Sequence, residues 1–356
     1  EGEEGKFYVW NKKQIVQILQ KDADVFCLYY DVTDGGNFEG HTILNNSIAM
    51  SSMAFHFGKP ESEIKSIIDE SSKKLLEERT NRVRPGLDDK IITSWNALMV
   101  SAFAKGYRVT DNPQYLECAQ RCIAFIQNSL LKDDNLLRTY KNGTAKLQAY
   151  LEDYAYLINA LVDLFEVNPE PKYLALAERL ANHLVEHFWD EKNSSFYFTA
   201  DNHESLIIRP KNNYDLSMPS GNSVAAGSLL KLFHLTGQKR FLEISTKIME
   251  NFAIMAAENP FGFGYLLNTI YLYLQNPTEI TMLNPQNKEI SEYITKKFLP
   301  ESILVSVQNP TQLDGLAKYP FFSGKEFEKE TTVFVCRNFS CSLPLKTVKE
   351  IESLLF

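Results

Sequence analysis

The sequence repeats one unit three times: a short polar signature, an apolar segment of helical length, and a segment with a single apolar stripe. The signatures begin at Asp88, Glu152 and Ser220, at intervals of 64 and 68 residues. Each striped segment opens with an aromatic residue followed by leucine, as in Tyr115-Leu116, Tyr173-Leu174 and Phe241-Leu242. A repeat of paired helices, one hidden and one half exposed, is typical of tandem helical hairpins.

The apolar segments, 91–107, 154–165 and 223–235, are predicted to be inner helices because they carry too few charges to face water. The striped segments are predicted to be outer helices, since their apolar residues step by three and four. Alternating inner and outer helices that close into a ring predict a mainly α fold, an α/α toroid. The polar signatures would then lie in loops at one end of its axial cavity.

Composition indicates an ordinary soluble globular protein, with 44% hydrophobic and 23% charged residues. The net charge of −8 and the absence of a basic cluster argue against a nucleic-acid partner. No apolar run reaches the roughly 18 residues of a membrane span, and the acidic start is not signal-like. We therefore expect no membrane partner and a cytoplasmic location. The five cysteines are sparse and odd in number, which predicts reduced thiols.

Three regions are expected along the chain. Residues 1–46 form an elaboration of extended pieces and a short helix, 47–276 form the toroid hairpins, and 277–356 form a small α/β tail. Extended pieces at 135–140 and 195–210 predict β-hairpins over the cavity mouth. Eight or nine helices are expected where a six-hairpin toroid needs twelve, so the ring is either open or lacks its first hairpins. The missing initiator Met makes the sequence read as a fragment.

Several motifs together resemble the YyaL-type, spermatogenesis-associated thioredoxin-domain family, in collinear order over the whole chain. They are Gly36-Asn37-Phe38-Glu39-Gly40, Arg84 to Asn96, Leu151-Glu152-Asp153-Tyr154-Ala155, Pro219-Ser220-Gly221-Asn222-Ser223, and Val335-Cys336-Arg337-Asn338 with Cys341. The resemblance implies a toroid of the six-hairpin glycosidase-like type, similar to N-acylglucosamine 2-epimerases. It also implies that an N-terminal thioredoxin-like domain and the first toroid hairpins, which would be partners of this part, are absent from the chain.

The family's activity is unassigned. No cofactor is expected. One segment departs from the family pattern. Asp215-Leu216-Ser217 stands where the family usually has Asp-Gly-Ala, and leucine adopts positive φ less readily than glycine. This departure puts the backbone shape of the loop before Pro219 in question.

Four carboxylates are the catalytic candidates: Asp88, Asp89, Glu152 and Asp153. A toroid would bring their two loops together, and a pair of carboxylates is the minimum for glycoside hydrolysis. Aromatic neighbours would raise the pKa of one of them and suit it to proton donation. The alternative is that these acids only cap helices, where they accept backbone N–H bonds and meet the positive helix end.

Residues around the same loops are the candidates for substrate binding. Aromatic rings stack on sugars, arginine binds anionic groups in bidentate fashion, and a helix start offers free N–H groups. The alternatives are ordinary helix caps and surface charges on strands. The candidates are Trp95, Asn96, Arg138, Tyr140, Tyr154, Arg209, Lys211, Ser220 and Asn222.

No metal is expected. His183, Glu186 and His187 match H-x-x-E-H, but they fall on an outer helix without a further acidic ligand. Cys336 and Cys341 lack thioredoxin spacing, so burial as small apolar groups is the default. The alternative is that they pair or exchange with the absent redox domain.

The sequence therefore favours a toroid of carbohydrate metabolism that binds a sugar-like small molecule, with glycoside hydrolysis or sugar isomerisation or epimerisation as candidate reactions. An epimerase would need histidines that face the cavity, and none is well placed. The rival interpretation is a non-catalytic scaffold or partner-binding module attached to a thioredoxin-like redox domain.

Overall fold

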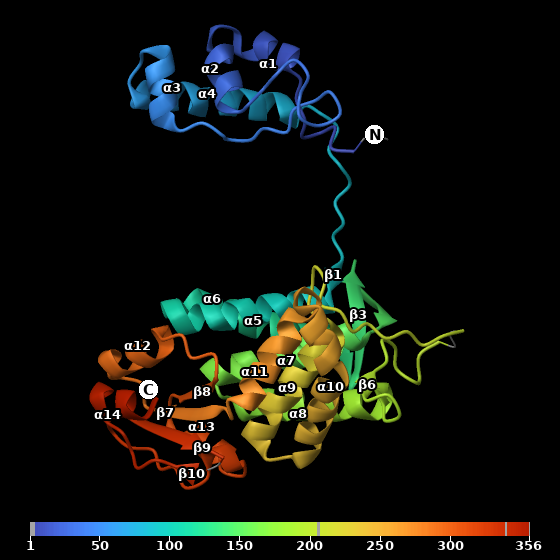
Figure 1. Ribbon diagram of the computed structural model, residues 1–356, viewed down its shortest axis with the longest axis vertical. Helices are drawn as coiled ribbons and strands as arrows, with labels where there is room; N and C mark the ends of the chain where they lie inside the picture. Colours follow the sequence, from blue (N-terminus) through green and yellow to red (C-terminus); the bar gives the residue numbers. More distant parts are fainter. Residues whose placement is uncertain (1–3, 205–206, 339, 356) are drawn as a thin grey trace. The chain divides into compact units, whose positions relative to one another are not determined.

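The computed structural model describes residues 4–204, 207–338 and 340–355 (Figure 1). The chain divides into two compact units, Glu1–Asp88 and Asp89–Phe356. The boundaries expected from the sequence, after residues 46 and 276, remain predictions. The helices at 50–80 are grouped by the structure with the N-terminal residues, because their apolar stripes pack there.

The first unit is a small helical cluster. It contains α1 (Lys12–Leu19), a 3₁₀ turn η1 (Gln20–Asp22), α2 (Ala23–Tyr29), α3 (Met50–Phe57) and α4 (Glu61–Thr80). Asn11 starts α1 with a capping box, because its side chain accepts from Gln14 N and its own N–H donates to the Gln14 side chain. In α4 the buried residues Ile64, Ile68 and Leu75 face α1 to α3.

The second unit confirms the predicted alternation of inner and outer helices. The inner helices are α5 (Thr93–Thr110), α7 (Leu151–Val167), α9 (Gly221–Thr236) and α11 (Gly264–Leu274). The outer ones are α6 (Pro113–Ser129), α8 (Pro171–Phe188) and α10 (Lys239–Glu258). The helices α5, α7 and α9 each pack against the next inner helix and against the outer helix that follows, and α11 packs against α9, so the inner helices form an arc. The fold is thus mainly α, with an incomplete α/α toroid.

Burial explains the two kinds of helix. In α7 almost every residue is buried, because the helix has α5, α8 and α9 around it. In α8 only one face is buried, through Leu174, Ala177, Leu184 and neighbouring residues. The outer helices α6 and α8 both begin with proline at their first position, where the missing N–H costs no hydrogen bond.

Short strands cover the ends of the helix pairs. β1 (Ile91–Ile92), β2 (Leu131–Lys132) and β4 (Thr144–Gln148) all pair antiparallel with β3 (Asn135–Lys141), which confirms the first predicted hairpin. The second hairpin is much shorter than predicted. It consists of β5 (Trp189–Asp190) and β6 (Ser195–Phe196), and the remaining described residues up to 210 form turns and irregular backbone.

The predicted α/β tail is present within the second unit. Its sheet has the order β10-β9-β7-β8, with β7 (Thr278–Leu283) parallel to β8 (Ser302–Val307) and antiparallel to β9 (Thr332–Arg337). One face packs on α12 (Lys288–Lys296) and α14 (Val348–Leu355), and the other contributes Ile303, Val305 and Val307 to the helical core. The remaining elements are η2 (Pro260–Phe263), α13 (Pro310–Leu316), η3 (Pro320–Phe322) and β10 (Ser340–Cys341).

Cys336 and Cys341 form a disulfide across β9 and β10, where they are direct register partners. The prediction of reduced thiols is therefore wrong for this pair, because the sheet register brings together two cysteines that lie five residues apart. Cys27, Cys118 and Cys122 are free thiols. Within the described ranges, no helix has the length and apolar character needed to cross a bilayer.

The close contact between α9 and α7 generates the first prediction. A Cβ on Gly221 would lie 2.6 Å from Leu151 Cγ and 3.2 Å from Glu152 N. We expect Gly221→Ala to lower the free energy of unfolding by about 1–3 kcal/mol through overpacking. The control is Gly264→Ala, because a Cβ at Gly264 meets no atom within 4 Å. Urea unfolding followed by circular dichroism measures both, and equal midpoints would contradict the packing argument.

Candidate functional site

The starts of the inner helices are joined to one another by side chains that accept backbone hydrogen bonds. Asp153 Oδ1 in α7 accepts from Ser94 N in α5 at 3.0 Å. Gly221, at the start of α9, lies directly against Leu151 and Glu152. Asp215 accepts from Ser220 N at 2.7 Å and from Tyr265 N in α11 at 2.8 Å. The second and third signatures therefore lie at the same end of the arc as the start of α5.

Asp153 is the centre of this junction and is fully buried. Its carboxylate accepts from Ser94 N, from Tyr150 N at 3.0 Å and from Arg138 Nη1 at 3.0 Å. Burial raises the pKa of Asp153, and the Arg138 guanidinium opposes that rise. Because all its contacts join α5, β3 and α7, Asp153 acts as a cross-helix cap and a positioning residue.

Glu152 lies beside this junction and is less enclosed, with 14% of its side chain exposed. Its Oε1 is 2.9 Å from Arg138 Nη1, so one guanidinium nitrogen serves both neighbouring acids. Arg138 also lies 4.9 Å from the ring centroid of Tyr150, which stacks on Phe198. We call Ser94, Arg138, Tyr150, Glu152 and Asp153 the helix-start cluster. Ser94 and Tyr150 were not among the predicted site residues, because each contacts Asp153 through its backbone N–H group.

The first signature is divided between the two units. Asp88 is an exposed residue at the end of the first unit, and Asp89 begins the second. Asp89 forms an ion pair with Lys141 in β3. The hydrogen bond from Lys141 lowers the pKa of Asp89 and keeps its carboxylate ionised.

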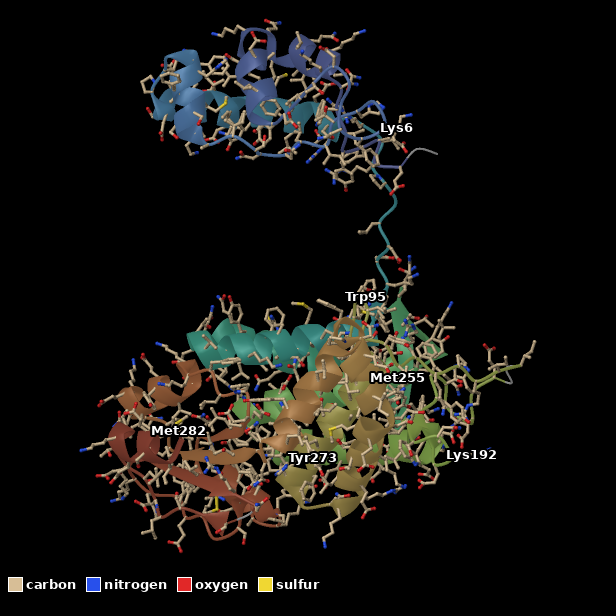
Figure 2. All side chains as sticks on the ribbon, viewed as in Figure 1. Lys6, Trp95, Lys192, Met255, Tyr273 and Met282 are labelled. Carbon is tan, nitrogen blue, oxygen red and sulfur yellow. A yellow bond between two sulfur atoms is a disulfide. The ribbon has the colours of Figure 1, made fainter. Side chains whose placement is uncertain are left out.

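The predicted aromatic and amide side chains differ in how far they are free to contact a ligand. Trp95 is 57% exposed at the start of α5 (Figure 2). Asn96 donates to Ile92 O at 2.9 Å, and the Tyr140 ring packs edge-on against Phe125. Tyr154 is buried, accepts from Leu136 N at 2.9 Å and has a pKa raised by burial to about 12. Of these four side chains, Trp95 is therefore the one that presents an open aromatic face.

The other predicted binding residues organise the segment between α8 and α9. Arg209 donates to Thr199 O at 2.6 Å, and Lys211 forms a 2.6 Å ion pair with Asp190. Asn222 accepts from Phe196 N at 2.7 Å, which fixes the second hairpin onto α9. Ser220 caps α9 by accepting from Ser223 N. Leu216 is not among the described residues with positive φ, so the Asp-Leu-Ser segment forms its loop without that strain.

A polar stripe on α7 is the main feature that the sequence analysis missed. Its members recur at intervals of four and three residues on one face of a helix read as almost wholly apolar, and they are Glu152, Tyr156, Asn159, Asp163 and Glu166. Asn159 is its middle link, because its amide donates to Ser101 Oγ and to Asp163 Oδ2 and accepts from Tyr265 OH. The spacing alone could have revealed this stripe.

At the C-terminal end of the stripe, the two buried acids of α7 meet cations of α5 and α9, of which Lys105 is largely exposed. We define this charged cluster as Lys105, Arg108, Asp163, Glu166 and Lys231. Lys231 Nζ lies 3.1 Å from Asp163 Oδ1 and 3.0 Å from Glu166 Oε1. Arg108 contacts Glu166 at 2.5 Å, and Lys105 contacts Asp163 at 3.4 Å. Burial alone would raise the pKa of Asp163, but the two lysines lower it to about 2. The same carboxylates raise the pKa of Lys231.

A cavity of about 550 Å³ adjoins the charged cluster through Arg108. Its walls come from the C-terminal end of α5, from α12 and from the carboxyl ends of β7 and β8. No group of three or more His, Cys, Asp or Glu side chains within the described residues is arranged to hold a metal ion. His183 instead stacks on Tyr154, and His187 contacts Asp201.

Removing Lys231, the cation that contacts both acids of the charged cluster, should be strongly destabilising. In Lys231→Met, Asp163 and Glu166 lose the ammonium that they share, and breaking such a buried pair costs about 3–5 kcal/mol. The measurement is the midpoint of urea unfolding. Lys239→Met, which removes an exposed lysine from the start of α10, is the control and should change stability little. A Lys231 variant as stable as this control would contradict the described pairing.

The depressed pKa of Asp163 predicts an acid-dependent loss of stability. The contribution of this carboxylate is complete above its unfolded pKa of about 4 and is lost as the pH falls toward about 2. Melting temperatures between pH 5 and pH 2 should therefore fall more steeply in the parent chain than in Asp163→Asn. Asp69→Asn, which removes an exposed acid paired with Lys65, should keep the parent slope. Identical slopes in all three proteins would contradict the assignment.

Comparison with known proteins gives homologues along the whole chain. An uncharacterised protein of Caenorhabditis elegans is 25% identical over 380 residues, which cover 99% of this chain and 52% of the relative. Spermatogenesis-associated protein 20 of Homo sapiens is 24% identical over 388 residues, which cover 99% of this chain and 49% of the relative. The chain thus spans about half the length of these curated relatives.

A family model described as the catalytic domain of beta-L-arabinofuranosidase, GH127, matches residues 92–253. Among solved structures, a cellobiose 2-epimerase from Bacillus thermoamylovorans has a TM-score of 0.40 at 14% identity and covers 67% of this chain and 72% of its own. An alpha-1,6-mannanase of a Salegentibacter species has a TM-score of 0.39 at 13% identity, with coverages of 68% and 70%. The whole-chain matches show that the chain is homologous to spermatogenesis-associated protein 20 and its relatives.

Proposed function

We propose that the second unit binds a sugar-like small molecule at the helix-start end of the arc, with Glu152 and Asp89 as the acid groups that act on it. The observation that carries the proposal is that the two adjacent acids, Glu152 and Asp153, differ in burial and in hydrogen bonding. Asp153 is buried and saturated with donors that join three elements, whereas Glu152 keeps an exposed edge beside it. A rigid buried acid that positions a more accessible one is typical of a built site.

The surrounding groups suit carbohydrate chemistry. Arg138 orients Glu152 at 2.9 Å, and the exposed Trp95 ring offers a flat face for stacking. Asp89, kept ionised by Lys141, suits the role of base or nucleophile, and Glu152 is the second carboxylate that the reaction needs. Glycoside hydrolysis is accordingly the reaction that we place first. Support also comes from the arabinofuranosidase family model, because its match includes Trp95, Arg138 and Glu152.

Sugar epimerisation or isomerisation ranks behind hydrolysis because it requires a facing acid and base, commonly histidine. His234, on inner helix α9, is buried and bonded to Glu279 of the α/β tail at 2.8 Å. His203 stacks on Tyr150, whose ring lies under Arg138. His203 is thus the histidine nearest to the helix-start cluster by described contacts, and it belongs to the segment between α8 and α9.

A non-catalytic scaffold is the second candidate function, and one observation favours it. Asp153, Ser220 and Asn222, the most buried of the predicted site residues, all have their polar atoms bonded to the protein itself. On this alternative the polar signatures exist to cap the inner helices, and the whole unit presents a surface or another domain to a partner.

The two functions are separated by comparing ligand binding and stability in the same variants. We expect thermal-shift assays with a panel of sugars, including arabinofuranosides and mannosides, to find a stabilising ligand. Glu152→Gln and Asp89→Asn should abolish that shift while changing unfolding by less than about 1 kcal/mol, because both acids are partly exposed. Asp153→Asn should instead destabilise the fold by about 2 kcal/mol, since an amide cannot accept from all three donors.

The control is Glu117→Gln, which removes an exposed acid from α6 and should change neither binding nor stability. Loss of stability without loss of ligand binding in the Glu152 and Asp89 variants would favour the scaffold. A panel in which no sugar raises the melting temperature would also count against the carbohydrate proposal.

A further inference from the structure

In the Cys336–Cys341 disulfide, one cysteine is buried and the other is exposed. Cys336 lies in β9 with 1% of its surface exposed, whereas Cys341 lies in β10 and is exposed. An incoming thiolate can therefore approach Cys341 but not Cys336. Exchange at a disulfide requires access to one sulfur and a leaving group that can carry negative charge.

Lys325 supplies a positive charge next to the exposed sulfur. Its Nζ lies 3.5 Å from Cys341 Sγ and also donates to Phe321 O, and its side chain is buried between the rings of Phe321 and Phe334. Among the described residues no carboxylate lies within ion-pair distance of Lys325. The acid that acts on its charge, Glu279, is hydrogen-bonded to His234.

Such a buried ammonium is costly unless an anion lies beside it. Burial accordingly lowers the pKa of Lys325 to about 8. While the disulfide is intact, the sulfur beside the lysine is neutral. Reduction would place a thiolate there and provide the missing counter-ion, so the surroundings of Lys325 favour the reduced pair.

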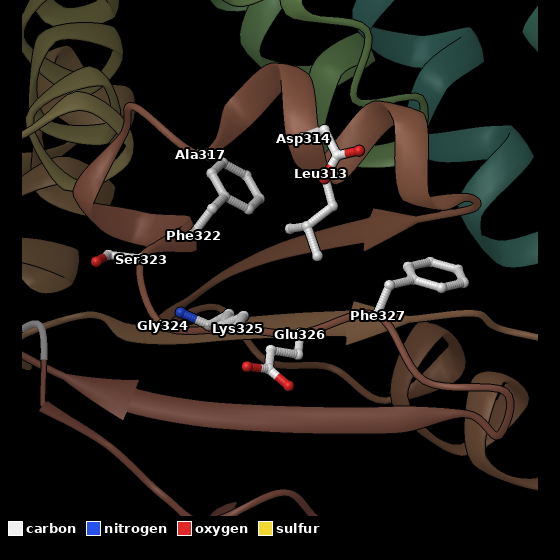
Figure 3. A pocket seen from close by; sticks show the side chains of 9 residues that line it. All are labelled: Leu313, Asp314, Ala317, Phe322, Ser323, Gly324, Lys325, Glu326 and Phe327. Atoms are coloured by element: carbon white, nitrogen blue, oxygen red, sulfur yellow. The ribbon is translucent and has the colours of Figure 1, made fainter.

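Lys325 also lines a cavity of the second unit. A cavity of about 410 Å³ is lined by Lys325 together with Asp314, Phe322, Glu326 and Phe327 (Figure 3). The walls combine acidic and aromatic side chains, and neither cysteine lines this cavity. The disulfide itself is reached through Cys341, the exposed member of the pair.

We propose that Cys336–Cys341 is a redox-active disulfide that accepts two electrons from a dithiol, with Lys325 as the positioning residue that stabilises the thiolate formed at Cys341. This activity is independent of the proposed sugar site, because it uses the α/β tail. It assigns a function to two cysteines that the sugar chemistry leaves unused.

The reduction takes place in two thiol–disulfide exchange steps. A thiolate of the dithiol attacks Cys341 Sγ, the Cys336–Cys341 bond breaks, and Cys336 leaves with the electron pair. The second thiolate of the dithiol then attacks its own mixed-disulfide sulfur and displaces Cys341 as a thiolate beside the Lys325 ammonium. The dithiol is oxidised to a disulfide, and its two protons end on the two cysteines or in solvent.

The test is a redox titration of the full 356-residue chain with reduced and oxidised dithiothreitol, followed by acid quench, maleimide labelling and peptide mass spectrometry. We expect Cys336 and Cys341 to be unlabelled in the oxidised chain and to become labelled together as the dithiol fraction rises. In Lys325→Met the equilibrium constant for reduction should fall about tenfold, which corresponds to one unit of thiol pKa. Lys325→Arg should retain most of the parent value.

Lys318→Met is the matched control, because Lys318 is an exposed lysine of the same segment, and its midpoint should equal that of the parent. If Lys325→Met does not fold by circular dichroism, the labelling rate of Cys341 against pH in the reduced parent replaces it, with an expected thiol pKa below the ordinary value of about 8.5. Labelling without reductant, resistance to excess dithiothreitol in the folded chain, a midpoint unchanged by Lys325→Met, or an ordinary thiol pKa would each overturn the proposal.

Discussion

The carboxylate of Asp153 is the interaction on which the candidate site depends. One buried group accepts hydrogen bonds from the start of α5, from the start of its own helix and from Arg138 in β3. It therefore sets the spacing of two inner helices and the position of the hairpin that lies over them. Glu152, its partly exposed neighbour in the chain, contacts the same guanidinium and is therefore held in place by the same junction.

The polar stripe of α7 shows how a central helix can be buried on every side and still carry charge. Asn159 passes hydrogen bonds between α5, α7 and α11, and Lys231 of α9 neutralises the two acids below it. Every inner helix thus contributes at least one polar group to the same continuous network. Such a network restricts which helices can pack together more strongly than apolar packing does. A buried polar group that lacks a hydrogen-bond partner is costly, so each helix must bring the matching partner.

The inner and outer helices could be predicted from periodicity because their burial follows from a single face or from the absence of charge. The extended segment predicted at 135–140 corresponds to β3, which spans Asn135–Lys141. The stripe on α7 was missed because Asp163 and Glu166 lie in a segment that consists mostly of leucine and aromatic residues. Only their spacing indicates that they share a face. The partners of the signatures could not be predicted, since Ser94 and Tyr150 contribute backbone groups and Lys231 is 65 residues from Glu166. The disulfide depended on a sheet register that composition does not encode.

The α/β tail has a further consequence for how the second unit is held together. All six residues of β7 are buried, and alternate residues of β8 enter the same apolar core as α7 while the others face α12 and α14. The sheet is therefore a shared wall between two layers of helices. Cutting the chain before β7 would expose an apolar flank of the inner helices. The arc is therefore expected to need the α/β tail in order to fold.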